Sequence, residues 1–135
     1  MFVLILALLL PLFDSSDDLT VLVSGCKSQK GQLFIALYDD KDEFPIFGKQ
    51  LMGEIVPLSK KPRHEFTFKK LVHKTYAIAV FHDINSNGKL DRNALGLPLE
   101  PYGFSNNARN TFSAPSFYQA SFVHGEEQSI SISVR

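Results

Sequence analysis

The residues best suited to chemistry lie at 82–91, HDINSNGKLD, where oxygen-bearing side chains alternate along the chain around one glycine. Calcium binds six to eight oxygens, and a loop supplies them when side chains at every second position converge around a sharp backbone turn. Gly88 takes the turn position of such a loop, and the carbonyl of Lys89 takes the next ligand position. The side-chain ligands that the spacing predicts are Asp83, Asn85, Asn87 and Asp91.

The predicted calcium-type loop, residues 83–94, is incomplete at its last position, where Ala94 stands in place of a bidentate acid. We expect Glu100 or a water molecule to complete the oxygen shell, because the glycine and proline residues in between let the chain fold back. Asp83 and Asp91 are the only charged ligands within the loop. The expected dissociation constant is therefore about 10⁻⁵ to 10⁻³ M, a range that suits an exported protein.

A metal-free polar turn explains the same residues. Asn and Asp side chains bond to nearby backbone amides in turns, and Asn87–Gly88 is a common two-residue hairpin signal. Against a hairpin, the next segment, LDRNALGLPLE, lacks the alternation that a partner strand needs. The sequence leaves both alternatives open.

Residues 96–117 mix aromatic side chains with amides. Rigid rings and adaptable amides recur at binding surfaces, so this segment is a candidate face for a glycan, a peptide or an envelope component. Its candidate ligand-binding residues are Tyr102, Phe104, Ser105, Asn106 and Asn107. The alternative is that the phenylalanines close the open end of the fold as core residues.

Catalytic patterns are weak in this sequence. Ser105 lacks the second glycine of a nucleophile elbow, so a triad with His82 and Asp83 is not expected. The four histidines have no metal-ligand spacing. We therefore predict no catalytic residue, and the alternative function is a small hydrolase or other enzyme that uses Glu100, Asp91 and His82.

Strands must position these loops, because the dominant hydrophobic period past residue 17 is two. Segment 31–39 is apolar on both faces, whereas Ile130, Ile132 and Val134 alternate with serines and are expected to point inward. Seven strands are expected, at 18–25, 31–39, 53–58, 63–71, 75–83, 119–125 and 127–135.

Strands of this length predict an all-β fold, a single antiparallel β-sandwich with one long ordered loop from Asp83 to about Phe117. An eight-stranded barrel is the nearest alternative. Loops longer than about 12 to 15 residues in compact domains are usually functional or internally organised. Something must therefore order this loop.

Size and charge limit the classes of function. A chain of 135 residues fits one domain. Fourteen basic residues balance fourteen acidic ones, so the net charge gives no attraction to nucleic acid or to an anionic membrane. The pairs Lys60–Lys61 and Lys69–Lys70 are interpreted as solvated strand ends.

Residues 1–16 are expected to form a signal peptide, because about twelve apolar residues precede a polar run and are too few to span a bilayer. The signal is atypical, since no Lys or Arg precedes Cys26. We expect a β-sandwich domain at 17–135, an exported protein in the periplasm or outside the cell, and membrane contact only through an uncleaved leader.

Three stretches resemble a bacterial family: GQLFIALYDD, TYAIAVFHDINSNGKLDRNALGLPLEPYGFSNNA and APSFYQASF, within residues 20–134. At these residues the chain resembles the exported bacterial proteins of the domain-of-unknown-function 2141 family. The resemblance implies an exported β-sandwich of immunoglobulin-like or prealbumin-like type, and it implies no activity. We favour a non-catalytic binding or structural module in which a calcium ion stiffens the long loop.

Overall fold

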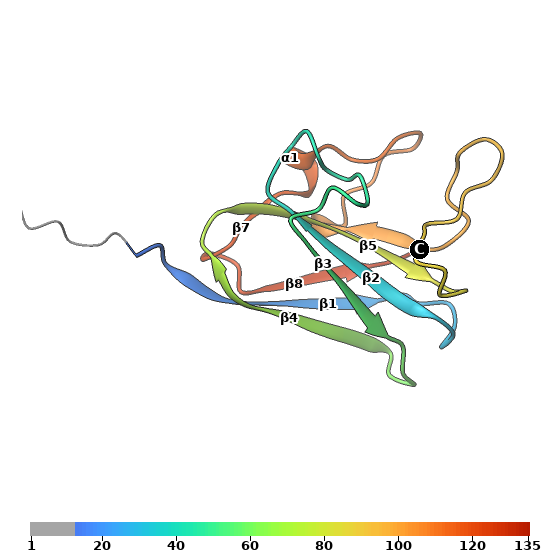
Figure 1. Cartoon of the computed structure of the whole chain (residues 1–135), viewed down its shortest axis with the longest axis horizontal. Coiled ribbons are helices and arrows are strands. Elements are labelled where there is room, and N and C mark those ends of the chain that lie inside the picture. The colour runs from blue at the N-terminus through green and yellow to red at the C-terminus, as the bar shows by residue number, and fades with distance from the viewer. Residues whose placement is uncertain (1–12) are drawn as a thin grey trace, which may run out of the picture.

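The computed structural model describes residues 13–135, so most of the expected signal peptide lies outside the described residues. Two sheets pack face to face (Figure 1), which confirms the all-β sandwich and sets the barrel aside. The elements are β1 (Ser16–Ser24), β2 (Gln32–Tyr38), β3 (Met52–Pro57), β4 (Arg63–Val72), β5 (Thr75–Asp83), β6 (Tyr102–Phe104), η1 (Ser105–Asn107), α1 (Phe117–Ala120), β7 (Phe122–Val123) and β8 (Ser129–Ser133).

The smaller sheet has the order β4-β1-β8, and the larger sheet has the order β3-β2-β5-β6, with β7 paired to the start of β5. Every strand pair is antiparallel except β1 with β8, which is parallel. The chain reaches β8 from β7 in the other sheet, so no hairpin turn imposes an antiparallel direction on it.

The main core lies between the two sheets. Every second residue of β1, β2, β5 and β8 points into it, as the period of two predicts. Ile130, Ile132 and Val134 are buried, in agreement with the inward face expected for the last strand. Other large members of this core are Leu19, Leu33, Leu37, Phe68, Tyr76 and Ile78.

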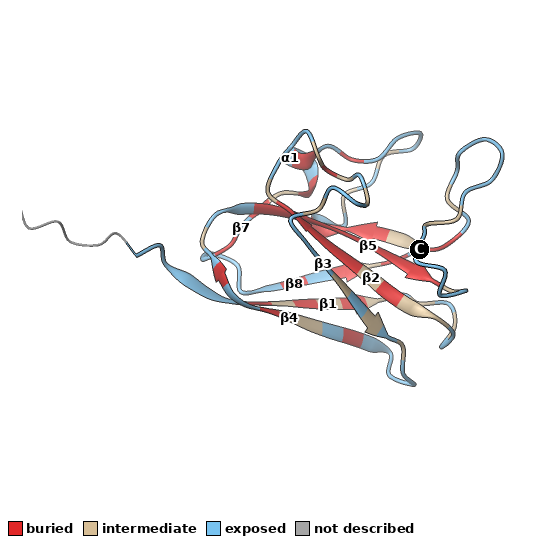
Figure 2. Ribbon diagram, in the orientation of Figure 1, coloured by how far each residue is buried: buried red, intermediate tan, exposed pale blue. Residues whose placement is uncertain are grey.

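A second apolar cluster covers the outer face of the larger sheet. Figure 2 shows β2 and β5 buried along most of their length, whereas β3 at the sheet edge is largely exposed. Phe44 and Phe117 pack over Ala36, Ala77 and Ala79 of the two central strands. This cover explains why segment 31–39 is apolar on both of its faces.

The segment expected as one long loop contains regular structure. The three residues of β6 pair with Ala79, Val80 and Phe81 of β5, and η1 follows at once. Further on, Ser116 caps α1 through a reciprocal pair of hydrogen bonds with Gln119. The expected loop is thus divided into a polar loop at 84–101 and a shorter connection at 108–116.

Candidate functional site

The polar loop, residues 84–101, follows the end of β5 and leads into β6, which pairs with β5. Its first anchor is the Asp83 carboxylate, which is completely buried. The backbone N–H groups of Asn87 and Gly88 donate to Asp83 at 3.1 and 2.8 Å. Gln32 on the neighbouring strand donates to the same carboxylate at 3.1 Å. Asp83 therefore fixes the turn at Gly88 to the larger sheet.

The second anchor is the carboxylate of Asp91. The side-chain amides of Asn85 and Asn87 donate to its two oxygens at 2.7 and 2.8 Å. These amide hydrogen bonds, Asn87 first, lower the pKa of Asp91, and the neighbouring Glu100 carboxyl group adds to the lowering. The three side chains that sequence spacing places at alternate positions therefore meet at one carboxylate.

Glu100 is the third anchor, and it is buried. Its carboxylate accepts the N–H of Ile84 at 2.6 Å and the N–H of Asp91 at 3.1 Å. The chain does fold back as expected, so that Glu100 holds the start and the middle of the loop together. Lys89 contributes its N–H to the Asn87 side-chain oxygen at 2.9 Å.

The polar loop does not by itself collect a set of acids around one point. Within residues 13–135, no three His, Cys, Asp or Glu side chains converge closely enough to hold a metal ion. A cation here requires amide and carbonyl oxygens in addition to carboxylates. Those are the oxygen types that calcium accepts.

Ser105, Asn106 and Asn107 serve the fold at the end of β6. The Ser105 hydroxyl is buried, accepts the N–H of Ile78 at 2.9 Å and donates to the carbonyl of Ala120. Asn106 donates to the Ser121 carbonyl at 2.8 Å, and the Asn107 oxygen accepts the N–H of Ser133. Both amide side chains therefore hold neighbouring backbone segments in place.

Tyr102 and Phe104 line a groove on the outer face of the larger sheet. Two adjoining hollows of about 160 and 690 Å³ share Pro45, Phe47 and Arg92 in their walls. The polar loop and connection 108–116 form one side of this groove, and segment 45–50 forms the other. Other residues of the groove are Phe34, Phe81, Leu90, Leu97, Asn110 and Phe112.

The structure does not bring the residues of a catalytic triad together. His82 points to the inner face, where its Nε2 lies 2.7 Å from the Lys30 carbonyl, and Asp83 points to the outer face. Ser105 bonds to Ile78, which precedes His82 by four residues along β5. At the usual strand rise, Ile78 and His82 are therefore about 13 Å apart.

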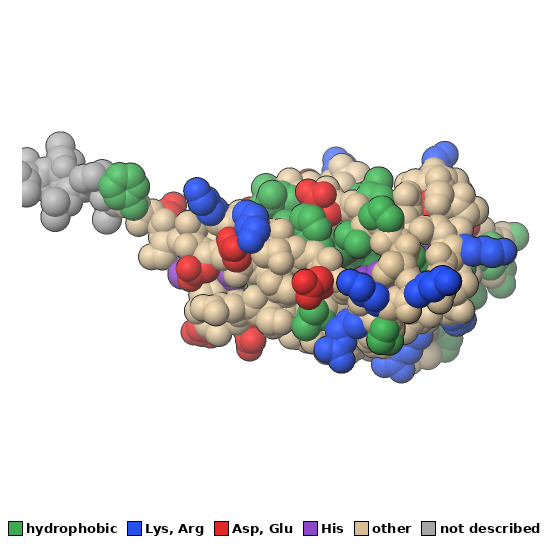
Figure 3. All heavy atoms as spheres, turned by 90° about the horizontal axis from the view of Figure 1, so that it is seen from below, with side chains coloured by type: hydrophobic (Ala, Val, Ile, Leu, Met, Phe, Trp, Pro, Cys, Tyr) green, Lys and Arg blue, Asp and Glu red, His purple; other side chains and the backbone are tan. Residues whose placement is uncertain are grey.

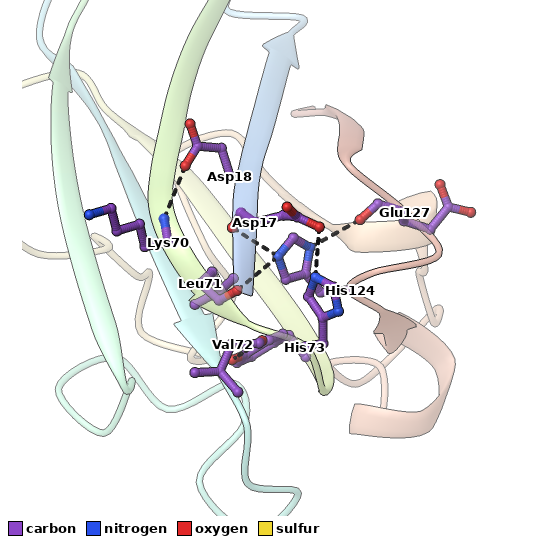
Figure 4. A network of polar contacts seen from close by, with 9 residues as sticks. Asp17, Asp18, Lys70, Leu71, Val72, His73, His124 and Glu127 are labelled. Carbon is purple, nitrogen blue, oxygen red and sulfur yellow. Dashed lines mark hydrogen bonds and ion pairs between the residues drawn. The ribbon is translucent and has the colours of Figure 1, made fainter. Parts of the chain in front are cut away.

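A second polar cluster, which sequence spacing did not reveal, ties β1 to the end of β4 (Figure 4). His73 lies 2.8 Å from the Asp17 carboxylate, and its ring meets the His124 ring edge to face at 5.2 Å. The buried His124 ring has carbonyl oxygens near both nitrogens, from Glu127, Asp17 and Leu71 at 3.1 to 3.2 Å. The residues lie more than 50 positions apart, so only their strand registers could have predicted the contact.

Fold and loop together define a class of protein: a β-sandwich with a three-anchored polar loop beside an aromatic groove. The sequence matches the family described as "Uncharacterized protein conserved in bacteria (DUF2141)" over residues 21–132. The chain belongs to this family, which confirms the resemblance. Comparison with curated proteins gave no match, nor did comparison with solved structures. Among residues 13–135, no helix has the length and apolar character needed to cross a membrane.

Proposed function

We propose that this chain is an exported, non-catalytic binding module whose polar loop takes up one calcium ion and so stiffens the wall of the aromatic groove. The observation that carries the proposal is the meeting of Asn85 and Asn87 at the Asp91 carboxylate, with Glu100 beside it. The Asp91 N–H also donates to Glu100 at 3.1 Å, and closely held carboxylate and amide oxygens are the ligands that calcium prefers.

The proposed ligand set combines side-chain and backbone oxygens. In it, the amides of Asn85 and Asn87 turn over, so that their oxygens rather than their N–H groups face the ion. Asp83 keeps its bonds to the loop amides and uses a remaining lone pair, since a carboxylate offers about four acceptor sites. The full set is Asp83, Asn85, Asn87, the Lys89 carbonyl, Asp91 and Glu100.

The groove is the proposed contact surface for a glycan, a peptide or another envelope component. Tyr102 is partly exposed in its wall, and the Arg109 guanidinium lies 4.7 Å from the centre of the Tyr102 ring. Asn110 adds an amide to the same wall. Ser105, Asn106 and Asn107 support this wall through backbone hydrogen bonds and are not proposed to touch the ligand.

A small hydrolase has less support. Such an enzyme needs His82 close to Asp91 or Glu100, but the imidazole lies on the opposite face of β5 from Asp83 and the polar loop. Each Glu100 oxygen accepts one backbone N–H, which fixes this carboxylate to the loop backbone and leaves one lone pair on each oxygen for an ion.

Thermal unfolding with and without calcium tests the proposal. At about 10 mM calcium and a dissociation constant of about 10⁻⁴ M, binding adds about 2.7 kcal/mol to the free energy of unfolding. This increment raises Tm by about 10 °C for a domain of this size. Magnesium, a smaller ion that prefers octahedral coordination, should raise Tm less.

Asp91→Asn removes a charged ligand at a half-buried position, and Asp42→Asn, at a carboxylate whose side chain is 78% exposed, is the control. Calcium should raise the Tm of the wild type and of Asp42→Asn, but not that of Asp91→Asn. Identical wild-type melting curves in calcium and in chelator would refute the ion site.

A further inference from the structure

Two loops of the sandwich carry positive charge and no negative charge. Residues 25–31 between β1 and β2 contain Lys27 and Lys30, and residues 58–63 contain Lys60, Lys61 and Arg63. Neither segment contains Asp or Glu. The two basic segments lie about 30 residues apart in the sequence, so the sequence alone gives no reason to expect that they share a surface.

Strand register places the two loops at the same end of the molecule. Ser24 at the end of β1 pairs with Arg63 at the start of β4, and Gln32 at the start of β2 pairs with Pro57 at the end of β3. Both loops also line one shallow hollow, which includes Lys27, Lys60 and Lys61. We call this surface the basic end: Lys27, Lys30, Lys60, Lys61 and Arg63.

In the described part of the chain, the basic side chains of this end form no ion pairs, although Glu65 lines a hollow with Lys61 and Arg63, and Asp83 on β5 pairs with Gln32 next to the first loop. All five side chains are exposed, and within residues 13–135 none of them forms an ion pair with a carboxylate. The paired lysines lie elsewhere, for example Lys69 with Asp18. In Figure 3 many Lys and Arg side chains of this face lie toward one end, whereas Asp and Glu side chains lie mostly toward the end that carries the N-terminus, where some Lys or Arg side chains also lie.

The overall neutrality of the chain therefore hides a charge separation along its long axis. Asp18 precedes Ser24 by six positions on β1, which is about 20 Å at the strand rise. This distance is more than twice the Debye length of about 8 Å at physiological salt. A flat anionic surface that touches the basic end meets these five exposed cations, and the acids nearest to them are Glu65 and the carboxylates of the polar loop rather than Asp18.

We propose that the basic end docks on the surface of an anionic phospholipid bilayer, with the lysines and Arg63 meeting lipid phosphates. A bilayer fits better than a nucleic acid, because neither loop offers an aromatic side chain on which a base could stack. Its planar surface also matches a patch confined to one end. The contact does not depend on the calcium loop or on the ligand of the groove.

The test is sedimentation of the full chain with vesicles, in chelator so that calcium plays no part. One set of vesicles is pure phosphatidylcholine, and the other has one third of it replaced by phosphatidylglycerol. A cation near an anionic surface strengthens binding about fivefold. The triple variant Lys27→Ser, Lys60→Ser, Lys61→Ser should therefore bind anionic vesicles about 100-fold more weakly than the wild type. Salt at about 1 M should abolish the preference for anionic vesicles, since the Debye length falls to about 3 Å.

The control variant Lys41→Ser, Lys69→Ser, Lys74→Ser has the same net charge, but its lysines are paired with aspartates elsewhere. It should keep the wild-type preference within about fivefold. Equal binding of the wild type to both vesicle types would overturn the proposal and assign binding to the apolar residues at the start of the chain. An equal loss in the control variant would assign it to net charge alone. Release of the protein from the vesicles by millimolar inorganic phosphate at constant ionic strength would also overturn the proposal, because such release would indicate a site for a small anion.

Discussion

Replacement of Ser105 by alanine is the sharpest test of how β6 is held to the rest of the fold. The hydroxyl is completely buried, accepts the N–H of Ile78 and donates to the carbonyl of Ala120. Alanine leaves both of these backbone groups without a partner in the interior. Each unsatisfied buried group costs about 1 to 3 kcal/mol, so Ser105→Ala should lower the free energy of unfolding by about 2 to 6 kcal/mol.

Urea unfolding measures this loss, and the corresponding fall in Tm is about 8 to 24 °C for a domain of this length. Ser131→Ala is the control, because Ser131 lies on the exposed face of β8 and should change stability by less than about 0.5 kcal/mol. A Ser105→Ala protein within 0.5 kcal/mol of the wild type would show that water or a shifted backbone satisfies Ile78 and Ala120. The claim that Ser105 is a structural residue would then be wrong.

Three further predictions concern the backbone and the charges. Gly31→Ala should destabilise the protein by about 3 kcal/mol or more in urea unfolding, because φ is +80° and the new Cβ would lie 2.0 Å from the Asp83 carbonyl; a loss below about 1 kcal/mol would contradict this crowding. The pKa of Asp18 is lowered by the Lys70 N–H and the Lys69 ammonium, so its contribution to stability is present above the unfolded value of 3.8 and is lost as pH falls below it. Melting curves across this range should show a smaller acid loss in Asp18→Asn than in the wild type. His124→Phe removes the ring nitrogens from their backbone partners, so Tm should fall by about 4 °C or more, and an unchanged Tm would mean that ring packing alone holds the site.

Much of the fold could be predicted from the sequence because its strands are long and alternate cleanly. Six of the seven expected strands appear close to their expected bounds, since a half-buried strand imposes a period of two that is visible in residues such as Ile130 and Ile132. The strand expected at 119–125 is reduced to β7 (Phe122–Val123), because Gln119 and Ala120 belong to α1. Strand β6 was missed because three residues, Tyr102 to Phe104, are too few to show a period. The parallel pairing of β8 was missed because register and direction depend on contacts distant in sequence.

The candidate site was predicted only in part. Asn85 and Asn87 do lie next to Asp91, because a tight loop places every second side chain on one side, and their role as cation ligands stays a prediction. The role of Ser105 was not visible, since an exposed and a buried serine look alike in sequence until the neighbouring strand is known. The basic end was missed for a related reason: Lys27 and Lys60 become neighbours only through the pairing of β1 with β4.

The side-by-side placement of the first and last long strands has a consequence for how the protein matures. Strand β1 has β4 on one side and β8 on the other, so its second edge stays open until residues 129–133 have been made. A growing chain therefore cannot complete the smaller sheet before residues 129–133 are available, and we expect folding to finish only with this final strand. Until synthesis is nearly finished, such a chain is still unfolded enough to pass through a narrow channel. This property suits any protein that has to cross such a channel before it folds.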